Sequence, residues 1–442
     1  MKQILALSAL ATMALWATVS TRAQTVQGVH VSTVGQSTPA RDVLKWPFSP
    51  DSIWNMPIGS GAIYTPTGLA PATELFGDID FFVVLNAADP LQPLFNDQNV
   101  WSGPRCSSTQ STGISLNVPA SLIVPDASGA STPNNSAAFL LPDGHTLEQV
   151  NALARCTSTG PVYGVPSELN GGAQEDLYGS GITGGHAGSN LSSIGGTIRL
   201  GELVGAGPIP HALKIDVDGS YLDGLVGFRW PANTDDSCAP GCDTGRIPGM
   251  VEGALLALPP NATEQSLGLT TAPGKKLFHA LQDYGGYIVD DAADPSYNLA
   301  VENGVKQEFL AFYGYDFDAF SASPWFNDFK AIFGTLQVVA NNGPTSIGGG
   351  GTPRAALAAP VSGPASPGIT AAVAASPGTI SPGGSSTLVW GVSGGTVSID
   401  QGIGSVALSG SRTVTPSVTT TYTLSASTSS GSLTRTVTVV VH

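Results

Sequence analysis

Short apolar runs, interrupted every few residues by Gly, Pro, Asn or Asp, constrain the fold of this 442-residue chain more than any other feature. Between residues 41 and 345 these runs are FFVVL, ISLNV, SLIV, AAFLL, YIVD and LQVV. Each has the length of a strand, and the residues between them are turn formers. The spacing favours a mainly β main domain over 41–345, a β-sandwich or jelly-roll-like body.

Two segments of this body have helical rather than strand periodicity. PGKKLFHALQDYG places Leu277, Leu281 and Tyr284 at helical spacing, between an early proline and a glycine stop. SPWFNDFKAIFGTL repeats the pattern with three phenylalanines on one face. We therefore predict two short helices packed against the ends of the sheet.

Composition changes sharply after the body. Residues 346–368 are almost entirely Gly, Ala, Pro and Ser and predict a linker, because they cannot bury enough apolar surface to fold alone. Residues 369–442 alternate Val and Thr with polar residues between Pro-Gly and Ser-Gly turns, which predicts a β-sandwich. The stretch ASPGTISPGGSSTLVW resembles the bacterial immunoglobulin-like modules of secreted proteins, with Trp390 and Tyr422 as its core aromatics.

The N-terminus predicts export. Lys2 precedes the apolar run ILALSALATMALWATV and a small-residue junction, which together indicate a signal peptide over 1–23, followed by an extension over 24–40. Cysteines in an exported protein are expected to be bridged. Cys106 and Cys156 lie in the similar settings PRC and ARC, and Cys238 and Cys242 close the short loop CAPGC, so we predict these two disulfides.

Charge excludes one class of partner. The formal net charge of −15 opposes binding to nucleic acid. Beyond the signal peptide no apolar segment reaches the length of a membrane span. We expect a secreted, extracellular monomer whose partner is a carbohydrate polymer.

The stretch GGTIRLGELVGAGPIPHALKIDV, residues 195–217, gathers ionisable residues in a chain of which only 11% is charged. We interpret it as two strands: Arg199 and Glu202 lie on the first, and His211 lies on the apolar face of the second. His186 precedes them in the glycine-rich loop GGHAGS. A carboxylate near an imidazole suits proton transfer, but a histidine on an apolar face is also typical of a core, and both interpretations stay open.

Further candidates lie outside this stretch. FLLPDGHTLEQV predicts a hairpin that places His145 after the turn and Glu148 in the return strand. We predict four catalytic candidates: His211 or His186 as general base, Glu202 as acid or orienting carboxylate, and Glu148 as a further carboxylate. The predicted substrate-binding residues are Arg199, Asp176, His145 and Trp230.

Residues from about 140 to 340 resemble an uncharacterised family of secreted bacterial proteins that share a pattern G-x-I-R-x-x-E-(Ile/Leu)-x-x-G-x-I-x-H-A-L. Glu202 and His211 match its glutamate and histidine, although VGAGP stretches the spacing between them. The resemblance implies a shared fold and some role for both residues. It does not imply a particular reaction.

No metal ligand or cofactor is predicted. DVDGSYLDG lacks the ligand spacing of an EF-hand, but its oxygen-rich loop leaves bound calcium open. Taken together, the sequence predicts a secreted carbohydrate-active enzyme that cleaves a polysaccharide, as a glycoside hydrolase or a polysaccharide lyase. The alternative is a secreted glycan-binding or adhesive protein without catalysis.

Overall fold

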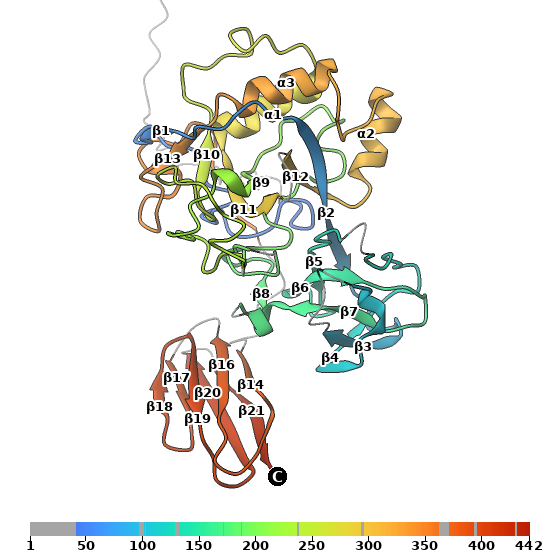
Figure 1. Ribbon diagram of the computed structural model, residues 1–442, viewed down its shortest axis with the longest axis vertical. Coiled ribbons are helices and arrows are strands. Elements are labelled where there is room, and N and C mark those ends of the chain that lie inside the picture. Colours follow the sequence, from blue (N-terminus) through green and yellow to red (C-terminus); the bar gives the residue numbers. More distant parts are fainter. Residues whose placement is uncertain are drawn as a thin grey trace, which may run out of the picture. The chain divides into compact units, whose positions relative to one another are not determined.

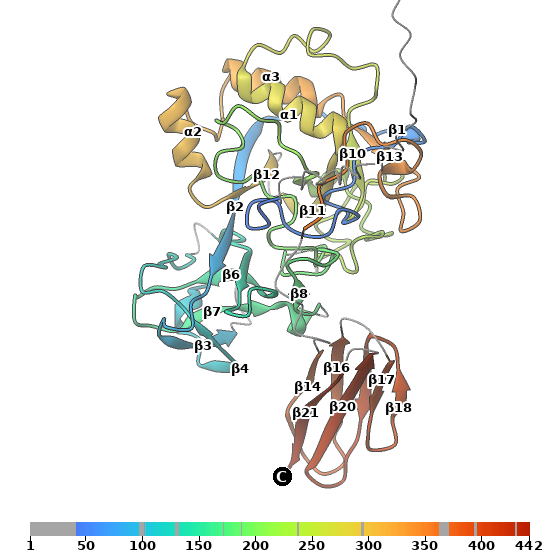
Figure 2. The same cartoon turned by 180° about the vertical axis from the view of Figure 1, so that it is seen from behind.

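The computed structural model describes residues 41–96, 101, 103–128, 132–170, 172–186, 188–236, 238–292, 296–361, 371–392, 396–428 and 431–442. These residues are mainly β, with three α-helices and a separate β region at the C-terminal end (Figures 1 and 2). The predicted fold class is therefore confirmed. The predicted signal peptide, 1–23, and extension, 24–40, lie outside the described residues.

Most strands of the body belong to one hydrogen-bonded sheet with the order β1-β13-β10-β11-β9-β12-β2-β5-β6-β7-β3-β4, to which β8 is added beside β6. In chain order the strands are β1 Tyr64–Pro66, β2 Glu74–Val84, β3 Leu91–Asn96, β4 Gln110–Asn117, β5 Ala137–Leu140, β6 Thr146–Ala154, β7 Val162–Pro166, β8 Glu175–Asp176, β9 Leu213–Asp218, β10 Leu255–Ala257, β11 Gly286–Ala292, β12 Ser296–Glu302 and β13 Gln337–Val339.

The long strand β2 joins two halves of this sheet. Its first part, residues 74–80, pairs in parallel with β12. Its second part, residues 81–84, pairs in parallel with β5. We call the strands from β1 to the first part of β2 the first half-sheet, and those from the second part of β2 to β4 the second half-sheet. Figure 1 shows β2 running from one to the other.

Three helices lie with the first half-sheet: α1 Ala272–Asp283, α2 Val305–Tyr313 and α3 Pro324–Phe333. The predicted helices are confirmed as α1 and α3, which begin where the side chains of Thr271 and Ser323 accept a hydrogen bond from the helix backbone. Helix α2 was not predicted from the sequence. Apolar residues of all three helices share one core with Leu213, Ile215 and Val217 of β9. This face of the first half-sheet is therefore apolar and covered.

The run of glycines that opens the predicted linker packs closely against the body. Gly348, Gly349, Gly350 and Gly351 all have positive φ. A Cβ at Gly59 would lie 2.0 Å from the oxygen of Gly350, and Gly61 donates a hydrogen bond to that oxygen. These glycines therefore allow backbone contact that a larger residue would block. Of the predicted linker 346–368, residues 346–361 are described, and the rest lie outside the described residues.

The C-terminal region is a β-sandwich. One sheet has the order β14-β16-β19 and the other β15-β21-β20-β17-β18. Trp390 and Tyr422 lie in its core at 7% and 4% exposure, which confirms the predicted packing role of both. The strands are β14 Ala371–Ser376, β15 Thr379–Ile380, β16 Ser386–Val392, β17 Thr396–Ile399, β18 Gly404–Val406, β19 Ser409–Val414, β20 Thr420–Thr428 and β21 Gly431–Val441.

Both predicted disulfides are formed, Cys106–Cys156 and Cys238–Cys242. These two disulfides are compatible with an oxidising compartment. Within the described part of the chain, no helix has the length and apolar character needed to cross a lipid bilayer.

The two disulfides are expected to differ in their effect on stability. They close loops with sequence separations of 50 and 4 residues, so loop-closure entropy assigns about 4 kcal/mol to the first and about 2 kcal/mol to the second. We expect the double variant Cys106→Ser, Cys156→Ser to lose more unfolding free energy in urea than Cys238→Ser, Cys242→Ser. Equal losses would contradict the entropic explanation.

Candidate functional site

The stretch 195–217 contains one strand rather than two. Residues 195–212 form turns and irregular structure, and only Leu213–Asp218 is a strand, β9. The predicted first strand over GTIRLGELV is therefore wrong. Ile198 makes a single parallel bridge to Val301 of β12, after which the chain turns away from the sheet. Because residues 195–212 do not form an extended strand, the alternation of apolar and polar residues in the sequence does not show which side chains share a face.

Arg199, Glu202 and His211 do converge. The Nε2 atom of His211 lies 3.1 Å from the Glu202 carboxylate, which also accepts a 2.7 Å hydrogen bond from the backbone nitrogen of Arg199. The Nε atom of Arg199 donates to Glu302 at 3.0 Å, and its guanidinium lies 5.0 Å from the centre of the Phe82 ring. Arg199, which was predicted to bind substrate, is thus paired with the carboxylate of Glu302 in the protein itself.

The surroundings of His211 favour a structural role. Its Nδ1 atom lies 2.8 Å from the carbonyl of Ala212, so both ring nitrogens face acceptors, an arrangement that favours the doubly protonated ring. Burial alone would lower the pKa of His211, but the charge and hydrogen bond of Glu202 outweigh it and the pKa is raised. Only 4% of the residue is exposed. A buried imidazole with both nitrogens held by groups of the protein is poorly placed to act as a general base on a substrate.

This pair predicts how stability depends on pH. Because the folded protein raises the pKa of His211 above its usual value, the pair stabilises the fold at low pH and loses that contribution as pH rises through the folded pKa. We expect Glu202→Gln to cost about 1.5–3 kcal/mol of unfolding free energy at pH 6 and to flatten the pH dependence. The exposed pair His279–Glu264 provides the control, since Glu264→Gln should cost less than about 1 kcal/mol. A Glu202→Gln variant with unchanged pH dependence would contradict this assignment.

His186 lies in a different cluster. Its Nε2 atom lies 3.5 Å from Asp78 and 3.9 Å from Asp80, two carboxylates on the same side of β2. Its side chain is fully buried, whereas 10% of the Asp78 side chain is exposed. We call Asp78, Asp80, His186 and Lys214 the β2 cluster. Of the four, Asp78 has the side chain most exposed to solvent.

Lys214 and Asp80 form the fixed part of the β2 cluster. The Nζ atom of Lys214 lies 2.7 Å from Asp80 and donates to the carbonyls of Ser192 and Ser193. Thr197 donates to the same Asp80 oxygen at 2.6 Å. Both charged side chains are essentially inaccessible to solvent. This pair therefore holds β2 and β9 in place rather than contacting a ligand.

The environment separates the two aspartates of β2. Burial acts to raise the pKa of Asp78, but the hydrogen bond and charge of His186, with help from Lys214, lower it below its usual value. Burial raises the pKa of Asp80 in spite of Lys214. Opposite shifts in neighbouring carboxyl groups are a sign of acid and base chemistry. Asp78 is thus the ionised and accessible carboxylate of the β2 cluster.

More carboxyl groups lie on the same face of the first half-sheet. Asp216 of β9 is 1% exposed and lies opposite Asn298 of β12. Burial, followed by the charge of Asp78, raises the pKa of Asp216 well above its usual value. The amide of Asn134 donates to Asp78 at 3.4 Å and to Asp290 of β11 at 2.6 Å. One amide therefore links the β2 cluster to the next carboxylate across the sheet.

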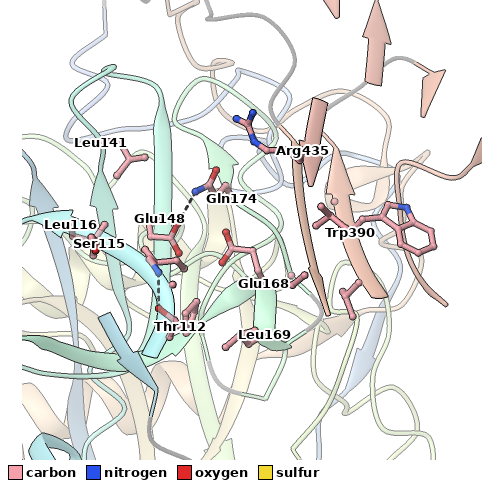
Figure 3. Close-up of a pocket in the computed structure, with 18 of the residues that line it drawn as sticks. Thr112, Ser115, Leu116, Leu141, Glu148, Glu168, Leu169, Gln174, Trp390 and Arg435 are labelled. Atoms are coloured by element: carbon pink, nitrogen blue, oxygen red, sulfur yellow. Dashed lines mark hydrogen bonds between the residues drawn. The ribbon is translucent and has the colours of Figure 1, made fainter. Parts of the chain in front are cut away.

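Glu148 lies in the return strand β6, as predicted, and belongs to another pair. It is 1% exposed and accepts a 2.7 Å hydrogen bond from Gln174 (Figure 3). Burial, and then the charge of Glu168, raises the pKa of Glu148 well above its usual value. Its contacts among the described residues do not include His186, Glu202 or His211. The four predicted catalytic residues thus fall into three separate groups.

Two of the predicted substrate-binding residues meet. The Nδ1 atom of His145 lies 3.5 Å from Asp176, and its ring centre is 4.8 Å from that of Tyr178. Asp143 accepts hydrogen bonds from the backbone of residues 145 and 146, so the predicted hairpin turn is present. Trp230 is half-buried against the core around Trp54. These contacts are typical of a turn and a core edge.

Four residues of these clusters were not predicted as site residues: Asp78, Asp80, Lys214 and Asp290. A signal was present, because ELFGDIDFFVV and HALKIDV each contain charged residues at alternate positions within otherwise apolar strands. A charge inside a buried strand is costly unless it is paired or functional. The aspartates of DVDGSYLDG, in contrast, do not converge: Asp218 accepts from Ser220, and Asp223 accepts from Leu225.

Comparison with protein-family models, with curated proteins and with solved structures finds no match to this chain. The class of the protein is therefore described here by its fold and its site alone. The class is a mainly β protein with two disulfides, a C-terminal β-sandwich, and a row of buried acidic side chains on one face of its main sheet.

Proposed function

We propose that the protein is a secreted carbohydrate-active enzyme that cleaves a polysaccharide at the β2 cluster. In this proposal Asp78 is the catalytic carboxylate and His186 is the group that exchanges a proton with it. Lys214 and Asp80 are positioning residues, because Lys214 holds Asp80 at 2.7 Å and Asp80 lies 3.9 Å from His186, while both side chains are shielded from solvent. The proposed catalytic residues therefore lie at β2 rather than at Glu202 and His211.

A single observation carries the proposal: His186 lies beside two aspartates, and its contact with Asp78 lowers the pKa of that carboxyl group, whose side chain is the most exposed of the β2 cluster. Glycosidic bonds are cleaved by positioned acids and bases, either through a pair of carboxyl groups or through proton abstraction beside a carboxylate. All four cysteines of the sequence are in disulfides, so no thiol is available as a nucleophile. The chemistry that the β2 cluster supports is therefore proton transfer.

The remaining parts of the proposal rest on the sequence. The predicted signal peptide and the two disulfides support secretion. The net charge of −15 and the predicted immunoglobulin-like module support an extracellular carbohydrate polymer, rather than nucleic acid, as the partner. We propose that the protein acts as a monomer.

A panel of polysaccharides tests the proposal. Purified mature protein is incubated with neutral and acidic polymers, and cleavage is followed by new reducing ends and by the absorbance of unsaturated sugars. Reducing ends alone indicate hydrolysis, and both signals together indicate elimination. Asp78→Asn must abolish whichever signal appears.

The same panel addresses the non-catalytic alternative. Retention of a polymer in affinity electrophoresis without any new ends, in both the original protein and Asp78→Asn, would contradict an enzyme and favour a glycan-binding protein. The sealed contacts of Glu202 and His211 are compatible with either outcome, because they stabilise the fold in both cases.

A further inference from the structure

Three carboxyl groups from separate segments of the chain meet at β11. Asp236, Glu252 and Asp290 each place one oxygen within 4.8 Å of the others. Asp290 belongs to β11, whereas the other two lie in irregular segments that cover the sheet. Glu252 is 0% exposed, Asp290 is 4% exposed, and Asp236 is half-buried. We call these three residues the β11 acidic site.

The charges around this site are not balanced by the protein. Burial raises the pKa of Glu252 well above its usual value, and the strongest charge effects on it all come from carboxylates: Asp236, Asp243 and Asp235. Burial and four neighbouring carboxylates act on Asp290 in the same direction. Within the described residues, the salt bridges that involve lysine, arginine or histidine do not include any of the three.

Buried carboxyl oxygens that face one another point to a ligand. The Oε2 atom of Glu252 and the Oδ2 atom of Asp236 are buried and face other carboxyl groups rather than an N–H donor, whereas the Oε1 atom of Glu252 accepts a 3.2 Å bond from the backbone of Asp236. Asp216 is the register partner of Asp290 on the neighbouring strand β9 and adds a further buried carboxyl group beside the site. Buried acceptors of this kind are normally paired or coordinate a metal.

Two hydrogen bonds orient the carboxylate of Asp290, and a glycine lies against the carboxylate of Glu252. Asn134 donates to one oxygen of Asp290 at 2.6 Å, and the backbone of Asp291 donates to the other at 3.1 Å. At Gly188, with φ of +67°, a Cβ would lie 2.5 Å from the Oε1 atom of Glu252. Such outer contacts fix carboxylate ligands in metal sites. A glycine here keeps the space beside the carboxylate open.

We propose that Asp236, Glu252 and Asp290 bind a divalent cation, and that calcium is the cation that fits them. The donors are all hard oxygens from carboxylates, which suit calcium or magnesium rather than a transition metal. Calcium accepts six to eight oxygens in flexible geometry, whereas magnesium demands a near-ideal octahedron. Ligands from one strand and two irregular segments favour the flexible case. The half-buried Asp236 provides the side on which water completes the coordination.

Calorimetry on the whole mature protein tests this proposal without a substrate. The protein is stripped with EDTA, dialysed, and titrated with calcium chloride and separately with magnesium chloride, and its melting temperature is recorded at each calcium concentration. We expect one calcium per chain, tighter than magnesium, and a melting temperature that rises with calcium. Absence of both calcium binding and a thermal shift would overturn the proposal. Tighter binding of magnesium would overturn its choice of calcium.

Two variants locate the site. Glu252→Gln keeps the size of the side chain and should weaken calcium binding by at least about tenfold. The calcium-free protein should stay folded, because burial and the neighbouring carboxylates already disfavour a charge at this position. Glu175→Gln is the matched control: burial raises the pKa of Glu175 to about 7, and it lies on β8 outside the site. Unchanged calcium affinity in Glu252→Gln would overturn the proposal. Should that variant not fold, Asp236→Asn at the half-buried position gives the same comparison.

The readouts keep this inference separate from catalysis. Calcium binding without cleavage of any polysaccharide would support the β11 acidic site and count against the enzyme. Cleavage of a polysaccharide by a protein that binds no calcium would support the enzyme and contradict the β11 acidic site.

Discussion

Asp78→Asn is expected to reduce the rate of polysaccharide cleavage by about 10³-fold, since a positioned acid or base contributes about 10²–10⁴-fold. The amide keeps the shape of the side chain and can still contact His186 and Asn134, but it cannot accept a proton. Its loss of charge also relieves repulsion with Asp216. Because the folded protein lowers the pKa of Asp78, its charge stabilises the fold at neutral pH, so we expect the variant to remain folded with a somewhat lower unfolding free energy.

The measurement is kcat on the substrate identified by the panel, with circular dichroism as the test of folding. Asp51→Asn at an exposed position is the matched control and should keep full activity. A folded Asp78→Asn protein with kcat within about threefold of the original would refute the assignment of Asp78, because acid or base catalysis contributes more than that.

Lys214→Met is expected to have the largest effect on stability, a loss of about 3–5 kcal/mol, because it leaves the buried Asp80 without its counter-charge. Lys214 is 0% exposed and contacts Asp80 at 2.7 Å. Methionine fills a similar volume, so the cost arises from the charge and from the freed carbonyls of Ser192 and Ser193. Urea unfolding at neutral pH measures it.

A second lysine separates the effect of the lost charge from that of the freed carbonyls. Like Lys214, Lys276 donates to backbone carbonyls, those of Glu202, Gly205 and Gly207, but it has no ion-pair partner among the described side chains. Lys276→Met should therefore cost less than Lys214→Met. Adding Asp80→Asn to Lys214→Met should recover part of the loss, since it removes the unpaired charge. No recovery in the double variant would show that the pairing with Asp80 is not what makes Lys214 important.

The elements that local sequence determines were predicted well. Thr271 and Ser323 cap helices whose apolar residues recur at helical spacing, and Asp143 with Gly144 forms a hairpin turn, so the signal lies within a few residues. The disulfides followed from spacing and setting. The segment 195–212 failed because contacts with distant residues fix it: Glu302, Glu308 and Lys276 bind its backbone.

The candidate site depended on strand pairing that no local pattern contains. Asp78 and Asp216 lie more than a hundred residues apart in the sequence, and β12, which is later in the chain than either, lies between β2 and β9. Glu252 and Asp236 reach Asp290 from irregular segments without periodicity. The alternating charged residues of DID, 78–80, and KID, 214–216, did indicate that each buried strand has one polar face. They could not indicate that the two polar faces lie next to each other in the sheet.

The continuity of β2 has a consequence for how the body unfolds. Since its first part pairs with β12 and its second part with β5, neither half-sheet can detach without breaking hydrogen bonds of the same strand. The body is thus expected to behave as one cooperative unit, and its amide protons in β5 and β12 should exchange with a common global opening energy. Genetic dissection between the half-sheets would then yield two insoluble fragments rather than two domains.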